Sequence, residues 1–326
     1  MILIFSRQDD GNTGAVTEWL RVMGKDFVRL NADDERTRLH YMDISNNKLM
    51  INQFGREINL CEATAVWFRR KGLSVKSIIR LPDKNNEEIF HDAPGLHREH
   101  VQKEMNTLVD FIYSYVSKGK PALGTPKSHS LNKLEVMLMA QELGLQIPRS
   151  YMVTSKAALN EVLTATGVSC ITKAMSDGVY RFTLQNAYYS YTERIGIEDI
   201  DSFPETFFPS LIQLEIRKKY ELRVFFLKDT LYAMAIFSQN DNTTVTDFRK
   251  YNQKRPNRTV PYKLPDVIED RLRNLMQALS LNTGSIDLIV DEREEYIFLE
   301  VNPVGQFGMT SQPCNYYLEK KIAQLL

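Results

Sequence analysis

Polar side chains interrupt two apolar strand patterns near the C-terminus, and this feature limits the possible folds most. The segment 285–306 has the pattern of two strands joined by a charged turn. Asp287 lies in the first strand, and Glu300 and Asn302 share one parity in the second, because residues two apart on a strand point the same way. If the strands pair antiparallel, these side chains converge. Two carboxylates and an amide oxygen are hard ligands that suit Mg²⁺, which completes its shell with water and nucleotide phosphates.

A solvated edge hairpin explains the same pattern. For the hairpin alone this is the commoner interpretation, because polar alternation is frequent in surface strands. Pro303 and Gly305 weigh against it, since they end the second strand abruptly, where a loop of a binding site would lie. On the opposite parity of that strand we expect an apolar face formed by Ile297, Leu299 and Val301.

The composition excludes several classes of protein. The 326 residues are enough for two or three packed units, and the charged residues balance to a formal net charge of zero. A neutral chain argues against a broad nucleic-acid surface or an anionic-membrane binder. The three cysteines are scattered, without C-x-x-C or zinc spacing, as is typical of free thiols in a reducing cytosol. No apolar stretch approaches a membrane span, so we expect a soluble cytoplasmic protein with neither nucleic-acid nor membrane partners.

The first 120 residues alternate between strand and helix patterns, which predicts an α/β unit. Within it, the stretch Trp67-Phe68-Arg69-Arg70 runs from an apolar strand directly into cations. Arg69 and Arg70 could bind carboxylates or phosphates with their planar guanidinium groups. A solvated strand end explains them equally well. A helix is expected at 96–116, and the segment 118–121, Lys-Gly-Lys-Pro, ends it and predicts a boundary near residue 120.

Two lysines in the middle third have positions that suit phosphate binding. Lys133 lies near the N-terminus of a helix that opens at Asn132, and Lys173 ends a strand ahead of the loop 174–178. A lysine at a strand end, followed by a small loop, can point its ammonium at a phosphate. Each lysine alone is typical of an exposed surface residue. Together, ahead of the carboxylate hairpin, they indicate a nucleotide clamp.

A short charged break separates two strands in the last third, at 211–216 and from Glu221 onward. Such a break leaves backbone groups unpaired, and an adenine edge can hydrogen-bond to them. Glu221 could accept from ribose hydroxyls, and Arg223, on the same face, could reach a phosphate. The loop 239–264 is long and locally basic, which would suit an acidic substrate and is equally typical of a mobile surface loop.

The order of these features resembles the ATP-grasp fold from about residue 121 to the C-terminus. The matching motifs are Asn132-Lys133, Lys173, Gln213-x-Glu215-Ile216, Glu221-x-Arg223, Asp287 and Glu300-x-Asn302-Pro303. Within that superfamily the chain most resembles the peptide-modifying ligases of graspetide (microviridin-type) biosynthesis, and among them the grasp-with-spasm maturases. The narrower resemblance rests on Trp67-Phe68-Arg69-Arg70, on the segment 213–223, and on Asp247-Phe248-Arg249 in the basic loop.

The resemblance implies an α/β (α+β) fold with a pre-ATP-grasp domain at 1–120, a central subdomain at 121–208 and a C-terminal subdomain at 209–326. It implies ATP and Mg²⁺ as cofactors. Lys133 and Lys173 would contact phosphates, and Arg223 would lie at the reacting phosphoryl group. The remaining nucleotide contacts, at the adenine and the ribose, would be Gln213, Glu215, Ile216 and Glu221. The magnesium ligands would be Asp287, Glu300 and Asn302.

The resemblance also implies a reaction. ATP would phosphorylate Asp or Glu side chains of a precursor peptide with a leader and a core. A Ser or Thr hydroxyl, or a Lys amine, would then form an ω-ester or ω-amide ring. Arg223 and Arg249 would be catalytic, Asp247 would assist the nucleophile, and Arg69, Arg70 and Arg249 would bind substrate.

A homodimer is also implied. Two alternatives remain: a ligase for amino acids or small molecules resembling glutathione synthetase or ribosomal-protein glutamate ligase, and a non-catalytic scaffold that binds peptide and nucleotide.

Overall fold

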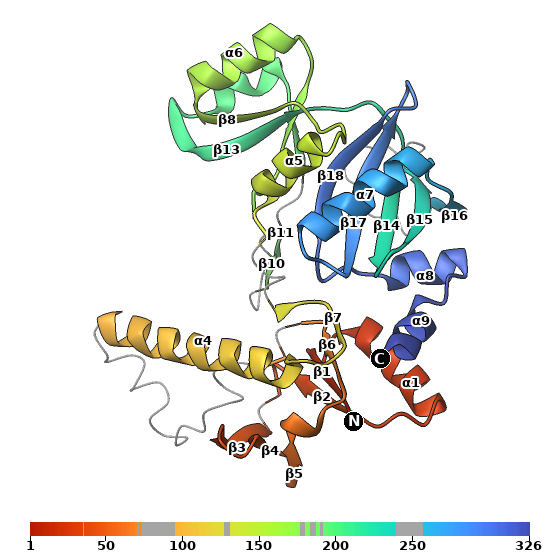
Figure 1. The fold of residues 1–326 in the computed structure, drawn as a ribbon. Helices are drawn as coiled ribbons and strands as arrows, with labels where there is room; N and C mark the ends of the chain where they lie inside the picture. Colours follow the sequence, from red (N-terminus) through yellow and green to blue (C-terminus); the bar gives the residue numbers. More distant parts are fainter. Residues whose placement is uncertain are drawn as a thin grey trace. The chain divides into compact units, whose positions relative to one another are not determined.

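The structure is a computed structural model whose described residues form two compact units (Figure 1). It describes residues 1–34, 36–70, 72–73, 95–126, 131–176, 180–182, 187–189, 192–238 and 257–326. Unit 1 consists of Met1–His129, Gln306–Ser311 and Tyr317–Leu326, and unit 2 of Ser130–Gly305 and Gln312–Tyr316. The sequence did not indicate that the C-terminal segments group with unit 1. The division into 1–120, 121–208 and 209–326 stays a prediction.

A parallel sheet of order β2-β1-β6-β7 forms the centre of unit 1. Its strands are β1 (Ile2–Ser6), β2 (Phe27–Asn31), β6 (Ala65–Phe68) and β7 (Ala122–Leu123). β1 and β6 are buried along their whole length, which explains why both are continuous apolar runs without alternation. Because these strands are parallel, the residues that follow β1 and β6 leave from the same edge of the sheet.

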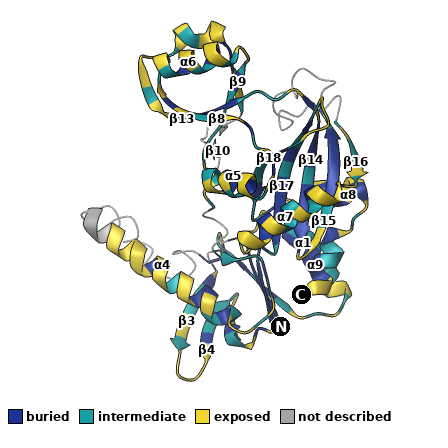
Figure 2. Cartoon of the chain, turned by 45° about the horizontal axis from the view of Figure 1, so that its top comes forward, coloured by how far each residue is buried: buried dark blue, intermediate teal, exposed yellow. Residues whose placement is uncertain are grey.

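Helices and a small antiparallel sheet complete unit 1. They are α1 (Gly11–Val22), α4 (Gly95–Ser117), α9 (Leu318–Leu325), the 3-10 helix η1 (Leu60–Glu62), and the strands β3 (Thr37–Asp43), β4 (Lys48–Gln53) and β5 (Arg56–Asn59). α9 lies along α1, where the Lys25 ammonium donates to the Ala323 carbonyl at 3.0 Å. Much of α4 is exposed (Figure 2).

Unit 2 contains a mixed region of helices and short strands that carries several predicted nucleotide residues. Its sheet has the order β12-β9-β13-β8. The elements are α5 (Lys133–Glu142), β8 (Ser150–Ser155), α6 (Lys156–Thr166), β9 (Cys170–Thr172), β10 (Tyr180–Phe182), β11 (Ala187–Tyr189), β12 (Glu193–Ile195), η3 (Ile197–Ser202) and β13 (Thr206–Leu214). α6 packs its buried Leu159 and Leu163 against this sheet, and β10 pairs with β11.

The large sheet of unit 2 has the order β16-β15-β14-β17-β18. Its strands are β14 (Lys218–Leu227), β15 (Thr230–Phe237), β16 (Arg258–Tyr262), β17 (Thr283–Asp291) and β18 (Tyr296–Asn302). α5 and α7 (Asp266–Ala278) cover one face, where Leu222 and Leu288 of the strands join Leu272 of α7 in one buried cluster. Side chains alternate along a strand, so the intervening residues lie on the other face, which we call the site face.

The predicted antiparallel pairing of the C-terminal hairpin is confirmed, but its expected apolar face is wrong. A register shift sets Asp287 opposite Glu300 and Leu288 opposite Phe298, so that Leu299 is an extra residue in β18. Phe298, rather than Ile297 or Leu299, is therefore fully buried in the core.

α8 (Gly308–Cys314) has residues in both units. Its last residue, Cys314, packs on Met234 and Ile236 of β15 within unit 2. None of the described helices combines the length and the apolar character that a bilayer crossing requires.

Candidate active site

Three charged residues lie in register across adjacent strands of the site face. Arg223 of β14 is paired with Asp287 of β17, and Asp287 with Glu300 of β18. Arg223 Nη1 lies 3.2 Å from Asp287 Oδ2. Asn302, two residues beyond Glu300, donates from its Nδ2 to Glu300 Oε1 at 2.9 Å. The convergence of Asp287, Glu300 and Asn302 that the sequence predicted is thus present.

Lys133 reaches the same cluster from the first residue of α5. Asn132 begins this helix by accepting from the Leu134 amide at 3.0 Å, and the Lys133 ammonium lies 3.1 Å from Glu300 Oε2. A cation at a helix N-terminus is opposed by the helix dipole unless an anion is close. Glu300 supplies that anion, which accounts for a lysine at this position.

The Glu300 carboxyl is largely buried and nevertheless ionised. Burial by itself would raise its pKa, but the charges of Lys133 and Lys173 and the hydrogen bond from Asn302 outweigh burial and hold the pKa below its usual range. Lys173 directly follows β9 and acts on Glu300 through its charge. Unit 2 therefore brings both predicted phosphate-binding lysines to the predicted metal carboxylate.

This donor set fits Mg²⁺ together with a nucleotide. Within the described ranges, no group of three or more His, Cys, Asp or Glu side chains gathers, so an all-protein metal cage is not formed there. Mg²⁺ usually takes only one or two carboxylates and draws its other ligands from water and phosphates. Two carboxylates, Asp287 and Glu300, face three cations, Lys133, Lys173 and Arg223. The excess positive charge suits phosphate groups.

The predicted adenine residues lie at the end of β13. Gln213 is fully buried and donates from Nε2 to Ser150 Oγ at 2.9 Å, while its Oε1 has no partner in the described part of the chain. Glu215 forms an ion pair with Arg194 at 2.9 Å, and Ile216 is half-buried. β13 ends at Leu214, so Glu215 and Ile216 lie in the expected break before β14.

Glu221, the predicted ribose residue, is buried beside a lysine that sequence reasoning missed. Lys218 Nζ lies 2.5 Å from Glu221 Oε1, and Ser238 Oγ donates to the same oxygen at 2.9 Å. Residues three apart on a regular strand point to opposite faces. A register shift between Lys218 and Tyr220 removes that separation, and no sequence signal marks it.

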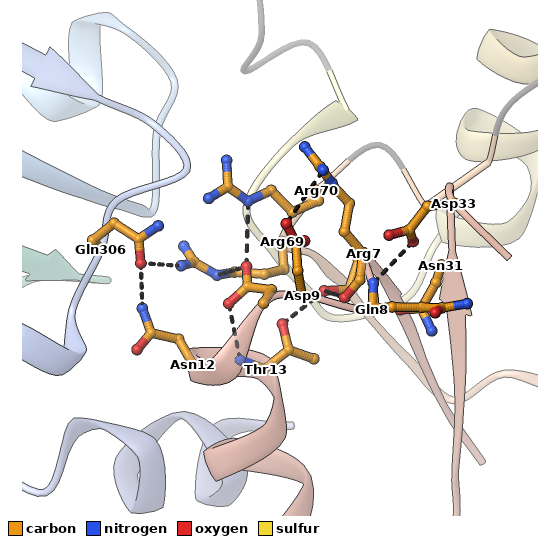
Figure 3. Close-up of polar contacts among 12 residues, drawn as sticks. Arg7, Gln8, Asp9, Asn12, Thr13, Asn31, Asp33, Arg69, Arg70 and Gln306 are labelled. Atoms are coloured by element: carbon orange, nitrogen blue, oxygen red, sulfur yellow. Dashed lines mark hydrogen bonds and ion pairs between the residues drawn. The ribbon is translucent and has the colours of Figure 1, made fainter. Parts of the chain in front are cut away.

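The predicted substrate residues Arg69 and Arg70 follow β6 in unit 1 and differ in exposure. The Nε atoms of Arg69 and Arg70 lie 3.1 and 3.3 Å from Asp10 Oδ2. Arg69 Nη2 donates to Gln306 Oε1 at 3.4 Å, and the same oxygen accepts from Asn12 Nδ2 at 2.6 Å (Figure 3). The Arg69 side chain is only 2% exposed, whereas that of Arg70 is 31% exposed.

Burial lowers the pKa of Arg69 to about 10, although Asp10 acts in the opposite direction, so the guanidinium stays charged at neutral pH. Arg69 is thus an internal partner of Asp10, and Arg70 is the arginine that solvent reaches. Their assignment to substrate binding stays a prediction. Asp247 and Arg249, predicted from the basic loop, lie outside the described residues, as does Gly178 of the loop after Lys173.

Comparison with solved structures gives matches over the whole chain. The macrocyclase MdnC from Microcystis aeruginosa MRC, bound with the precursor peptide MdnA, has a TM-score of 0.78 and 26% identity, covering 100% of this chain and 99% of that one. A RiPP-associated ATP-grasp ligase from Chryseobacterium gregarium, in complex with ADP and a leader and core peptide, has a TM-score of 0.77 and 23% identity, over 99% and 94%.

A more distant match also extends over nearly the whole chain. D-alanyl-alanine synthetase A from Vibrio cholerae O1 biovar eltor has a TM-score of 0.55 and 15% identity, over 99% of this chain and 96% of that one. No family model matches the chain, and no curated protein does. The predicted α/β ATP-grasp fold is confirmed. The chain has the ATP-grasp fold, and over its whole length this fold is similar to that of the macrocyclase MdnC.

Proposed function

We propose that this chain is a peptide macrocyclase. With ATP and Mg²⁺ it activates Asp or Glu side chains of a ribosomal precursor peptide and closes ω-ester rings with Thr or Ser, or ω-amide rings with Lys. The observation that carries the proposal is the meeting of Lys133, Lys173 and Arg223 with Asp287 and Glu300 on one sheet face. The full-length likeness to ligases that hold ADP and precursor peptides supports it further.

The reaction has two steps. A carboxylate oxygen of the peptide attacks the γ-phosphorus of ATP, and the bond to the β,γ-bridging oxygen breaks, which gives an acyl phosphate and ADP. A hydroxyl or amine of the same peptide then attacks the acyl carbon, phosphate leaves, and the nucleophile loses its proton to a base, for which Asp247 is the candidate. Each ring therefore removes the mass of one water from the peptide.

The protein contributes charge and positioning. Lys133 and Lys173 neutralise the phosphates, and Arg223 stabilises the charge that develops on the transferred phosphoryl group. Asp287, Glu300 and Asn302 would hold Mg²⁺, which supplies further neutralisation of the phosphate oxygens when it is bound. Glu221 orients the ribose. Holding the peptide carboxylate in line with the γ-phosphorus and its leaving oxygen makes the bimolecular phosphoryl transfer behave as an intramolecular one.

The test is mass spectrometry of a precursor peptide after incubation with enzyme, ATP and Mg²⁺. The peptide to test is the product, with its leader, of any short neighbouring reading frame that is rich in Thr, Ser, Asp, Glu or Lys. We expect the loss of one water per ring, abolished in Glu300→Gln and retained in Glu292→Gln, an exposed turn residue of the same hairpin. A gain of amino-acid mass would instead identify an amino-acid ligase. An unchanged peptide, with folded enzyme, would identify a scaffold.

Two finer points complete the proposal. The resemblance to graspetide maturases implies that the chain works as a homodimer, which sedimentation analysis of the purified protein tests. It also implies a cytoplasmic location, where ATP is available and thiols stay reduced. Fractionation of producing cells tests that second point.

A further inference from the structure

A buried lysine beside the predicted ribose residue has no role in the reaction proposed above. The Lys218 side chain is 6% exposed, and its ammonium contacts Glu221 Oε1. Within the described part of the chain this is the one acceptor it has, although an ammonium carries three donors. Burying an ammonium with so few hydrogen-bond partners lowers the stability of the fold, so its presence indicates a functional role.

The geometry of Glu221 indicates what the charge does. Oε1 is occupied by Lys218 and by the Ser238 hydroxyl, at 2.5 and 2.9 Å. Both hydrogen bonds that the Glu221 carboxylate receives within the described part of the chain go to Oε1 rather than Oε2, and the side chain keeps 12% of its surface exposed. One oxygen of the carboxylate is therefore fixed and the other is left as an acceptor.

The backbone is shaped to make this contact. Lys218 is opposite Asp291 and Tyr220 is opposite Val290, so that one residue, Lys219, is extra in β14. Such a bulge turns a side chain away from the direction that strand alternation gives it. Two residues further, Arg223 lies on the same face as Glu221 and contacts Asp287. Glu221 Oε2 thus lies on the side of the sheet that carries the predicted phosphate residues.

We infer that Lys218 is a positioning residue for the nucleotide: it holds Glu221 so that Oε2 accepts hydrogen bonds from the ribose hydroxyls of ATP. The inference rests on the proposed function, since it takes ATP as the substrate. It predicts that discrimination between ribose and deoxyribose depends on a lysine that does not touch the reacting atoms. Ser238, which donates to the same Glu221 oxygen, supports the same orientation.

The experiment measures KM and kcat for ATP, 2′-deoxy-ATP and 3′-deoxy-ATP from peptide-dependent ADP release. The wild-type protein should prefer ATP over at least one deoxy analogue by about tenfold or more, because a hydrogen bond to a charged group is lost with the hydroxyl. In Lys218→Met the ratio of kcat/KM for ATP to kcat/KM for the deoxy analogue should fall towards one. The cause should be a higher KM for ATP, with kcat changed by less than about threefold. Lys218→Arg should restore part of the preference.

Lys219→Met is the matched control, because Lys219 is the neighbouring lysine and its exposed ammonium pairs with Glu294 instead. It should keep the wild-type preference. If circular dichroism shows that Lys218→Met does not fold, Ser238→Ala is used as the test instead. This variant should also reduce the preference for ATP over the deoxy analogues. An unchanged preference in the folded variant overturns the inference while ATP use stands. A wild-type protein that uses no ATP overturns the proposed function and the inference with it.

Discussion

Asp10 should be among the residues on which the stability of unit 1 depends most. Its Oδ1 accepts from the Thr13 amide at 3.2 Å and caps α1, and its Oδ2 faces the Nε atoms of both Arg69 and Arg70. Removing an N-cap costs about 1 kcal/mol. Removing one partner of a buried ion pair costs about 3–5 kcal/mol, because the remaining charge stays buried. Asp10→Ala should therefore destabilise unit 1 by about 4 kcal/mol or more.

The two tryptophans of the chain, Trp19 and Trp67, both belong to unit 1, so urea unfolding followed by tryptophan fluorescence reports on this unit. Asp9→Ala is the control: Asp9 is exposed and pairs with the exposed Arg7, and the change should stay within about 0.5 kcal/mol. Asp10→Asn keeps a capping side chain and should fall between the two. A loss below about 1 kcal/mol in Asp10→Ala would refute the reasoning.

Three further predictions concern unit 2. Phe298→Ala should cost about 3–5 kcal/mol by thermal unfolding, because Phe298 is fully buried, whereas Phe208→Ala should cost little at a side chain that is 78% exposed. Gly305→Ala should cost at least about 1–2 kcal/mol, since φ is +48° and a Cβ would lie 2.7 Å from the Ser285 nitrogen; an unchanged melting temperature would contradict this. ADP with Mg²⁺ at a hundredfold excess over Kd should stabilise the protein by about 2.7 kcal/mol, and EDTA or Asp287→Asn should remove that gain.

The fold was predictable where local patterns agree with tertiary packing. The apolar run that ends at Phe68 identified β6, and parity in the C-terminal hairpin placed Glu300 and Asn302 on one face. The prediction from strand alternation was wrong at Phe298, because a bulge changes which residues face the core without changing the sequence pattern. A one-residue insertion in a ladder depends on the partner strand, which single-sequence periodicity does not contain.

The residues of the candidate site were also predictable in part. The prediction missed contacts that depend on a β-bulge or on residues far apart in the sequence. The sequence placed Lys133 at a helix start and assigned it to phosphates, but it did not indicate that the ammonium would lie 3.1 Å from Glu300 Oε2. Lys218 was missed because another bulge brings it to Glu221. Arg69 and Arg70 were indistinguishable in sequence, yet Asp10 and Gln306, from distant parts of the chain, bury one and leave the other exposed.

The ion pair between Arg223 and Asp287 offers a test of whether the site face is built for stability or for function. Both side chains are largely buried, and Arg223 Nε has no hydrogen-bond partner in the described part of the chain. An unpaired buried donor costs about 1–3 kcal/mol. Replacing a buried ion pair by apolar residues of similar volume is often neutral or stabilising by about 1–4 kcal/mol, whereas removing one partner is destabilising.

The double variant Arg223→Met/Asp287→Leu should therefore be at least as stable as the wild-type protein by thermal unfolding, while each single variant is less stable. All three should have lost ADP release with peptide. Glu269→Gln/Arg273→Met, which removes a partly exposed pair on α7, should leave activity unchanged. A double variant less stable than both single variants would mean that the pair serves the fold. A double variant that is as stable as the wild-type protein but inactive would mean that the two charges are needed for the nucleotide. The fold would then be equally stable with an apolar pair at these positions.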